Sequence, residues 1–345
     1  MTTYTSSWLC PSNIALVKYW GKRAEQLPMN PSLSFSLKQA RTRTSMTLLP
    51  RKGTRIDFLF EGVGSPFAAR IEKYLDSLSL DLPWINDFSF QIESENTFPH
   101  STGIASSASA FGALALCLGD LNRQMTGAHA DDEKFFQAAS RLARLGSGSA
   151  ARSVYGGFAW WGKSAAVPGS TDCHAISVSK LRHNSYFSLC DAVLLVDSKM
   201  KKVSSSAGHE LMNHHPYKEA RVKQANCTIE RLIQLMKTDR NRMAFIDAVE
   251  QEALSLHALM MSSSPSFLLL KAGSLELIER IRNFRRQTDL AVGFTIDAGP
   301  NIHLLYWQEN QEEVHRFIRS ELLAYTENGV WLDDRVGNGP VKLNG

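Results

Sequence analysis

The chain has 345 residues, 43% of them hydrophobic and 21% charged, which suits a globular protein of one large domain or two average ones. Its formal net charge of +4 is small, and it has no basic stripe with interleaved aromatic residues, so we do not expect nucleic-acid binding. No stretch approaches 18 uninterrupted apolar residues, so we expect no membrane span.

The cysteine pattern and the first residues indicate a cellular compartment. Five cysteines are widely spaced, and no pair has CxxC spacing, so neither a zinc site nor a disulfide framework is indicated. This usage fits a reducing environment. The N-terminal residues MTTYTSSWLC lack a basic region followed by an apolar stretch, so they do not form a secretory signal. We therefore expect a cytoplasmic enzyme.

The first half mixes strand and helix patterns. Alternation of apolar and polar residues predicts strands at 45–49, 55–60 and 87–93. Apolar residues four apart predict an amphipathic helix over 66–78, and an alanine-rich apolar run predicts a buried helix over 106–122. Asp131 and Asp132 are candidate N-caps of a helix that runs to about residue 145.

The second half adds more of both elements without a regular βαβ repeat. The patterns predict strands at 192–196, 292–296 and 302–307, and helices at 217–236, 242–260, 275–286 and 311–325. An irregular mixture favours an α+β fold over a doubly wound parallel sheet. The change of pattern near 185–191 predicts a domain boundary there, which gives domains 1–187 and 188–345.

One candidate site is the segment 99–109, which reads PHSTGIASSAS and leads directly into the predicted buried helix. A helix N-terminus presents free N–H groups and partial positive charge to a phosphate, and small side chains allow close approach. The segment is not a Walker-type loop. Taken alone, its serines fit a helix cap better than a phosphate site.

A second candidate is the segment 146–157, GSGSAARSVYGG. A flexible Gly-Ser backbone followed by Arg152 suits an anion with several oxygens, because a guanidinium can bind a carboxylate or phosphate with two hydrogen bonds. The alternative is a glycine-rich loop whose arginine pairs with a surface acid.

Two further segments carry charged residues next to apolar strands. In NIALVKYWGK, Lys18, Tyr19 and Lys22 supply two cations and a hydroxyl, or else belong to a solvated edge strand. In FTIDAGPN, Asp297 ends an apolar strand before a Gly-Pro turn, where an aspartate often only caps the turn.

The histidines are weaker candidates. His209, His214 and His215 cluster in a loop-like stretch, where surface histidines are the better interpretation than metal ligands. His257 lies inside a helical pattern and is expected to be a packing residue rather than a base.

Together and in this order, the four segments resemble the mevalonate diphosphate decarboxylases of the GHMP kinase superfamily. The matching stretches are NIALVKYWGK, GIASSASAFGALAL, GSGSAARSVYGGF and FTIDAGPN, with KKVSSSAG at 201–208 as a fifth. The resemblance extends from about Pro11 to Pro340. It implies a two-domain GHMP kinase-like α+β fold. The first domain would resemble domain 2 of ribosomal protein S5 and bind ATP, and the second would be a ferredoxin-like α/β sandwich that carries Asp297.

The resemblance also implies roles for individual residues. Asp297, Lys18, Arg152 and Ser106 would be catalytic, with Asp297 deprotonating a tertiary hydroxyl and Arg152 binding the substrate carboxylate. Substrate would further contact Asn13, Tyr19, Lys22, Ser147, Ser149 and Ser205. ATP, accompanied by Mg²⁺, would contact Gly103, Ala105, Ser106, Ser107 and Ser109. No metal ligands are assigned.

The implied reaction is ATP-dependent decarboxylation of mevalonate 5-diphosphate to isopentenyl diphosphate, through 3-phosphorylation, in isoprenoid biosynthesis. The chain departs from the family pattern at His100 and His209, both near the anion sites. These departures concern the phosphorylation state of the substrate, so one alternative is a mevalonate 5-phosphate decarboxylase. Further alternatives are a kinase that stops at the 3-phosphate and a non-catalytic binding protein on the same fold. Family resemblance also makes a homodimer possible.

Overall fold

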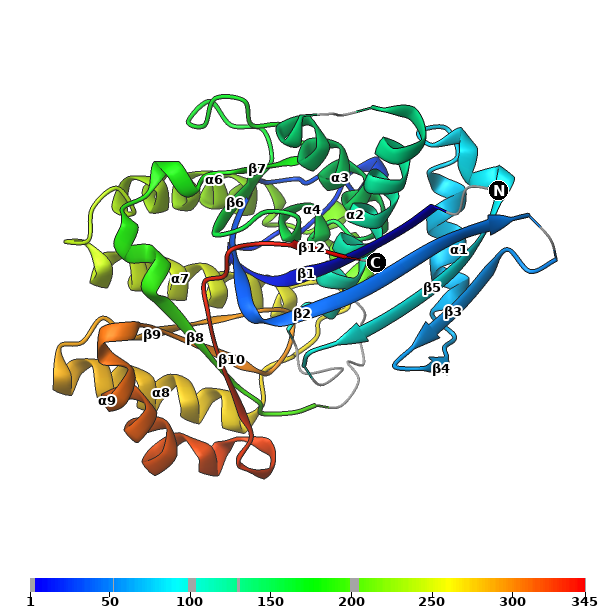
Figure 1. The fold of residues 1–345 in the computed structure, drawn as a ribbon. Coiled ribbons are helices and arrows are strands. Elements are labelled where there is room, and N and C mark those ends of the chain that lie inside the picture. The colour runs from blue at the N-terminus through cyan, green and yellow to red at the C-terminus, as the bar shows by residue number, and fades with distance from the viewer. Residues whose placement is uncertain (1–3, 52, 99–103, 129–130, 199–204, 345) are drawn as a thin grey trace.

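The structure is a computed structural model that describes residues 4–51, 53–98, 104–128, 131–198 and 205–344. The chain forms two β-sheets, each covered by helices, and the two parts lie against each other (Figure 1). Within the described residues, no helix is long and apolar enough to cross a membrane. Because strands and helices are mixed without a regular βαβ repeat, the fold class is α+β, as predicted.

The first sheet is built around two long strands, β1 (Tyr4–Val17) and β2 (Ser32–Pro50). Its main path runs β12-β1-β2-β5-β3-β4, and β6 and β7 extend from β2. All pairs are antiparallel except β3 with β5. The other strands are β3 (Ile56–Phe60), β4 (Val63–Gly64), β5 (Phe88–Asn96), β6 (Phe158–Trp161), β7 (Ala175–Ser177) and β12 (Val341–Leu343).

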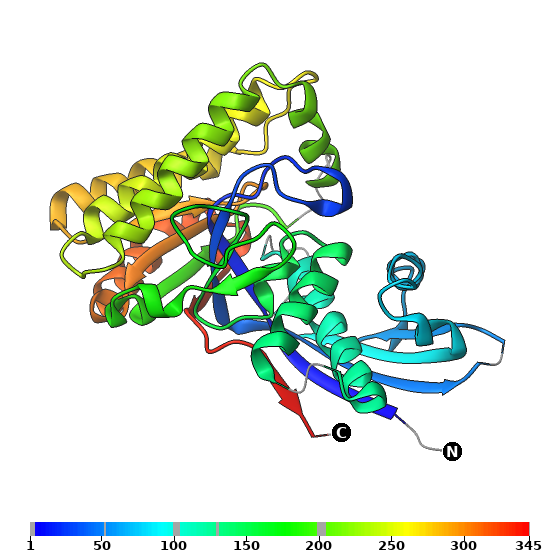
Figure 2. The ribbon, with the colours of Figure 1, turned by 90° about the horizontal axis from the view of Figure 1, so that it is seen from above.

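Helices cover one face of this sheet. They are α1 (Ala68–Ser77), α2 (Ser106–Thr126), α3 (Asp132–Gly146) and the short α4 (Ala150–Ser153). Figure 2 shows α2 lying along β1 and β2, and α3 packs against α2. Helix α2 is apolar on most sides because it is buried between the sheet and α3. Gly112 allows this close packing, since a Cβ there would lie 2.6 Å from Cys10 Sγ.

The second sheet has the order β11-β8-β10-β9, all antiparallel. Its strands are β8 (Leu189–Leu194), β9 (Gly293–Ile296), β10 (Ile302–Trp307) and β11 (Trp331–Arg335). Helices α8 (Ala272–Thr288) and α9 (Gln311–Phe317) cover one face, and α6 (Lys218–Leu235) and α7 (Arg242–Met261) lie on the other side (Figure 1). A further helix, α5 (Ser205–Leu211), precedes α6.

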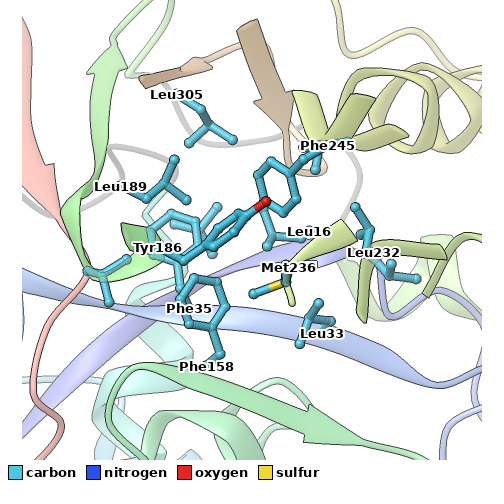
Figure 3. Close-up of a cluster of buried hydrophobic side chains, with 14 of the residues drawn as sticks. Leu16, Leu33, Phe35, Phe158, Tyr186, Leu189, Leu232, Met236, Phe245 and Leu305 are labelled. Carbon is cyan, nitrogen blue, oxygen red and sulfur yellow. The ribbon is translucent and has the colours of Figure 1, made fainter. Parts of the chain in front are cut away.

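One hydrophobic core joins the two sheets. Figure 3 shows side chains from both sheets and from α6 and α7 converging around Tyr186. The labelled members are Leu16, Leu33, Phe35, Phe158, Tyr186, Leu189, Leu232, Met236, Phe245 and Leu305. Tyr186 meets Phe245 edge to face, with ring centroids 5.1 Å apart. Because each half buries apolar surface against the other, their relative placement is fixed by packing.

Most predicted helices match the observed ones within a few residues, and the predicted strands 55–60, 87–93, 192–196, 292–296 and 302–307 are all present. Two predictions were wrong in extent. The predicted strand 45–49 is only the end of the 19-residue β2. The helix predicted over 311–325 is α-helical to Phe317 and continues as a π-turn and a 3₁₀-turn.

Several strands were missed, most importantly β1. Its side chains are buried on both faces, so it lacks the alternation that marks a half-exposed strand. It also contains Pro11, next to which the register with β2 shifts. The strand β12 pairs with β1 in the first sheet, although it lies at the end of the second predicted domain. The boundary at 187/188 stays a prediction.

Candidate active site

Lys18 and Asp297 meet where the two sheets face each other. Lys18 is the first residue after β1, and Asp297 is the first residue after β9. Their side chains form an ion pair with 2.7 Å between Lys18 Nζ and Asp297 Oδ1. The lysine side chain is only 3% exposed, whereas the carboxylate is 25% exposed and therefore accessible to a ligand.

Arg152 belongs to the same centre. It lies on α4, almost fully buried, and donates a hydrogen bond to the Ser32 hydroxyl. Burial lowers the pKa of Arg152 to about 10, and the nearby Asp297 charge opposes that shift. Its Nε finds no hydrogen-bond acceptor within the described residues. A buried cation with an unsatisfied donor fits an anionic ligand such as a carboxylate.

Tyr19 is held rigidly beside this centre. Its ring centroid lies 4.7 Å from that of Trp161 and 4.4 Å from that of His209. Its hydroxyl donates to the Gln26 carbonyl at 3.2 Å, and burial raises its pKa. Gly148 allows the ring to approach the backbone, because a Cβ there would lie 2.6 Å from the ring.

Lys22 and His209 complete this side of the site. Lys22 Nζ lies 3.3 Å from Gln26 Oε1. His209 is 8% exposed, so its predicted place on the surface was wrong. Its Nδ1 accepts the Gly21 N–H at 3.0 Å, which leaves the ring proton on Nε2. Burial, with a contribution from the Lys22 charge, lowers the pKa of His209 to about 3.

Of the other candidate histidines, one lies elsewhere than predicted and two lie as predicted. His215 is also buried and hydrogen-bonded to the Leu259 carbonyl, so its predicted surface position was wrong too, whereas His214 is exposed. His257 lies buried in α7, as predicted, with Nε2 3.1 Å from the Asp297 carbonyl oxygen. Within the residues that the structure describes, no three His, Cys, Asp or Glu side chains gather around a possible metal position.

The predicted phosphate segment 99–109 runs into α2, which begins at Ser106. Ala105 has a φ of 25°, a tight left-handed turn into the helix. The first N–H groups of α2 have no partners inside the helix and therefore suit an anion. Ser107 Oγ lies 3.4 Å from Ser147 Oγ, which in turn lies 3.4 Å from Ser149 Oγ. The helix start and the glycine-rich loop therefore face each other.

Two of the predicted ligands, Ser109 and Asn13, are buried and bonded to the loops themselves. Ser109 is fully buried, with its hydroxyl 2.6 Å from Thr42 Oγ1 and donating to the Ser106 carbonyl at 3.1 Å. Asn13 donates to the Ser149 carbonyl at 3.0 Å and to the Ser153 hydroxyl at 2.8 Å. Both side chains therefore hold the loops in place. Gly103 and His100 lie outside the described residues, and Ser205 begins α5 with its side chain undescribed.

Sequence reasoning missed the residues that support the site from behind. The fully buried Ser12 donates to the carbonyls of Ile104 and Ala105, at 3.1 and 3.3 Å, and so ties β1 to the phosphate loop. A hydroxyl residue next to Asn13 in an apolar strand was the available signal. Arg221 and Glu252, which contact the backbone of Lys18, gave no signal because they lie on separate helices far along the chain.

The site combines an anion-binding helix start, a buried arginine and a lysine–aspartate pair between two α+β layers. This combination defines a small-molecule enzyme of the GHMP kinase-like class, in which phosphoryl transfer depends on positioning and charge neutralisation. The helix start and loop serines also suit Mg²⁺, which binds mainly through phosphate oxygens and water and needs few protein ligands.

Comparison with known proteins identifies the family. Residues 10–175 match the diphosphomevalonate decarboxylase-like N-terminal domain, and residues 192–335 match the mevalonate 5-diphosphate decarboxylase C-terminal domain. The diphosphomevalonate decarboxylase of Debaryomyces hansenii is 31% identical over 91% of this chain and 82% of its own length. That of Saccharomyces cerevisiae is 31% identical over 92% of this chain and 82% of its own length.

Solved structures agree with this result. The crystal structure of mevalonate diphosphate decarboxylase from Staphylococcus aureus is 28% identical and superposes with a TM-score of 0.85 over 99% of both chains. A complex of the protein abbreviated MDDEF with MVAPP, AMPPCP and magnesium is 26% identical, with a TM-score of 0.83 over 100% of both chains. The chain belongs to the diphosphomevalonate decarboxylase family, whose members are ATP-using carboxy-lyases.

Proposed function

We propose that this protein decarboxylates mevalonate 5-diphosphate to isopentenyl diphosphate with consumption of ATP, after phosphorylating the tertiary hydroxyl at C3. The observation that carries the proposal is the Lys18–Asp297 pair at 2.7 Å beside the buried Arg152. A substrate with a hydroxyl, a carboxylate and a diphosphate needs a base, an arginine and a polar anion pocket, and this site supplies all three.

Asp297 is the proposed base. Its carboxylate takes the proton of the 3-hydroxyl as the oxygen attacks the γ-phosphorus of ATP. Lys18 holds the carboxylate in place through the 2.7 Å contact between Nζ and Oδ1. His257, 3.1 Å from the Asp297 carbonyl oxygen, fixes the backbone that carries the base. Phosphorylation converts a poor leaving group into a good one, and loss of phosphate and CO₂ then forms the alkene.

Arg152 is the proposed ligand of the substrate carboxylate. Its unsatisfied Nε and its burial supply a strong, fixed donor for one end of the substrate. Asn13 supports this end of the site through its bonds to Ser149 and Ser153. Holding the carboxylate also orients C3 toward Asp297, which is the positioning that the reaction needs.

The diphosphate is proposed to bind across the glycine-rich loop. Tyr19, Lys22, Ser147 and Ser149 offer hydroxyls and a cation there, and Ser205 is carried over from the family pattern. The buried ring of His209 is neutral near pH 7 and packs against Tyr19. Lys22 is then the cation of this group.

ATP is proposed to bind with its phosphates at the start of α2. The N–H groups at Ala105, Ser106 and Ser107 would contact the phosphate oxygens, Ser106 would assist transfer, and Gly103 is carried over from the family pattern. Ser109 would act by fixing the helix start. Mg²⁺, when bound, would neutralise charge on the β- and γ-phosphates, with the loop serines as the protein groups near it.

One assay tests the proposal and separates its alternatives. Purified protein is incubated with ATP, Mg²⁺ and, in turn, mevalonate 5-diphosphate, mevalonate 5-phosphate and mevalonate, while ADP and CO₂ are followed. We expect both products with the diphosphate. ADP without CO₂ would indicate a 3-kinase, both products with the monophosphate alone would indicate the monophosphate decarboxylase, and neither product with any acid would indicate a binding protein.

A further inference from the structure

A fully buried ion pair lies directly behind Lys18. Arg221 of α6 and Glu252 of α7 form two parallel hydrogen bonds of 2.8 and 2.5 Å, and both side chains are 0% exposed. Removing both charges from water is costly, and an apolar pair of similar volume often gives equal or greater stability. Stability alone therefore does not explain the presence of this pair.

Both members of the pair contact the backbone of Lys18. Glu252 Oε1 accepts the Lys18 N–H at 2.9 Å, and Arg221 Nη2 donates to the Lys18 carbonyl at 2.9 Å. Asn30 donates to the same carbonyl at 3.0 Å. Lys18 lies just beyond the last β1–β2 pair, Val17 with Leu33, so its peptide groups have no strand partner. Three buried side chains replace the sheet at this one residue.

Helix α7 holds both members of the catalytic pair. Glu252 binds the backbone of Lys18, and His257, five residues later, lies 3.1 Å from the Asp297 carbonyl oxygen. Helix α7 also packs against β9, the strand that leads to Asp297 (Figure 1). The separation of Lys18 Nζ and Asp297 Oδ1 is thus set by one rigid element that contacts both backbones.

We propose that the Arg221–Glu252 pair is a positioning device that fixes the Lys18 backbone so that its ammonium group reaches Asp297. The inference rests on the proposed function, because Lys18 and Asp297 are the reacting pair there. Both side chains are fully buried, which leaves them no surface for contact with a substrate. They align Lys18 with Asp297 and therefore affect kcat. Displacement of a catalytic group by about 1 Å can lower the rate on the order of 100-fold.

The test uses a variant that removes the pair and keeps the volume apolar, Arg221→Met/Glu252→Leu. The matched control is Arg285→Met/Glu250→Leu. Glu250 lies two residues earlier on α7, is almost as buried, and binds Arg285 of α8 at 2.6 Å without contacting Lys18. Both variants are assayed for thermal unfolding, kcat and KM for each substrate, and the first is crystallised.

We expect kcat of the Arg221→Met/Glu252→Leu variant to fall by about 10- to 100-fold, with KM changed less than about threefold. The control should keep kcat within about twofold, even if its unfolding temperature falls by as much as that of the Arg221→Met/Glu252→Leu variant. Equal losses of kcat in both variants would reduce the pair to a structural role and overturn the proposal.

Two further measurements keep the test decisive. Glu252→Gln retains an acceptor oxygen for the Lys18 N–H, so it should lose stability but keep most of kcat. If the double variant does not fold, Arg221→Lys replaces it: a single ammonium group cannot span both Glu252 oxygens and the Lys18 carbonyl, so kcat should fall by about tenfold, and an unchanged kcat would overturn the proposal. The crystal structure should place Lys18 Nζ more than about 4 Å from Asp297 Oδ1, beyond salt-bridge distance. An unchanged 2.7 Å contact would overturn the proposal whether or not the protein proves to be a decarboxylase.

Discussion

Ordinary residues acquire special chemistry here through neighbours that are distant in the sequence. Asp297 reads as a turn residue until Lys18, 279 positions away, is placed 2.7 Å from its carboxylate. The sequence pattern places Arg152 in a glycine-rich loop. The structure adds that burial lowers its pKa, while the Asp297 charge opposes that shift. In each case the surroundings, rather than the residue type, determine the proposed role.

The substitution Asp297→Asn tests the proposed base. An amide cannot accept the hydroxyl proton at neutral pH, so we expect kcat to fall by about 10²- to 10⁴-fold. The amide has nearly the same shape, so calorimetric binding of mevalonate 5-diphosphate should change little. Asp289→Asn, at the exposed C-terminal end of α8, is the control and should behave as the unmodified protein. A near-normal kcat in Asp297→Asn would remove this residue from its role.

A second residue-scale prediction concerns His209 and pH. Its pKa is about 3 in the folded protein, compared with 6.5 for an unperturbed histidine. Between these values the unfolded chain binds more protons, so the folded state loses up to about 1.4 kcal/mol per pH unit as pH falls below 6.5. The substitution His209→Met removes this titration.

Urea unfolding of both proteins at pH 7, 6 and 5 measures the effect. We expect the difference in unfolding free energy between the unmodified protein and His209→Met to shift in favour of the variant by about 2 kcal/mol between pH 7 and 5. Parallel pH dependence of the two proteins would show that the ring is not held neutral.

At the scale of the elements, most helices and several short strands could be predicted from the sequence, and the full extent of the two long strands β1 and β2 could not. Helix α2 was found because its apolar run begins at a serine-rich start. Strand β1 was missed because its buried faces give no alternation and Pro11 interrupts the pattern. Both loops of the site were recognised, but their 3.4 Å approach through Ser107 and Ser147 depends on packing that no local pattern contains.

The glycine-rich loop gives the element-scale prediction, through Gly148→Ala. The new Cβ would lie 2.6 Å from the Tyr19 ring, which Trp161 and His209 prevent from moving freely. We expect KM for mevalonate 5-diphosphate to rise about tenfold and stability to fall by about 1–3 kcal/mol. Gly64→Ala is the control, since a Cβ there meets nothing within 4 Å. Equal KM values in the two variants would contradict a fixed Tyr19.

At the scale of the whole molecule, the C-terminal segment ties the two sheets together. After β11 in the second sheet, the chain crosses to the first, where Gly337 donates to the Ser36 carbonyl at 2.8 Å and β12 pairs with β1. The Asp334 carboxylate, buried at the crossing, accepts the N–H groups of Lys38, Gln39 and Ala40 at 2.8, 2.9 and 2.8 Å. Together with the shared core, this segment should make the sheets unfold as one unit.

The substitution Asp334→Asn tests this coupling. The amide nitrogen would face a backbone N–H and leave a buried donor without an acceptor, so the unfolding free energy should fall by about 2–3 kcal/mol. Far-UV circular dichroism and tryptophan fluorescence, which senses Trp160 and Trp307 in the shared core, should still report one coincident transition at a lower temperature. Asp57→Asn, on the exposed side of β3, should leave the midpoint unchanged. Separate transitions by the two probes in the unmodified protein would show that the sheets are independent and that Asp334 acts only locally.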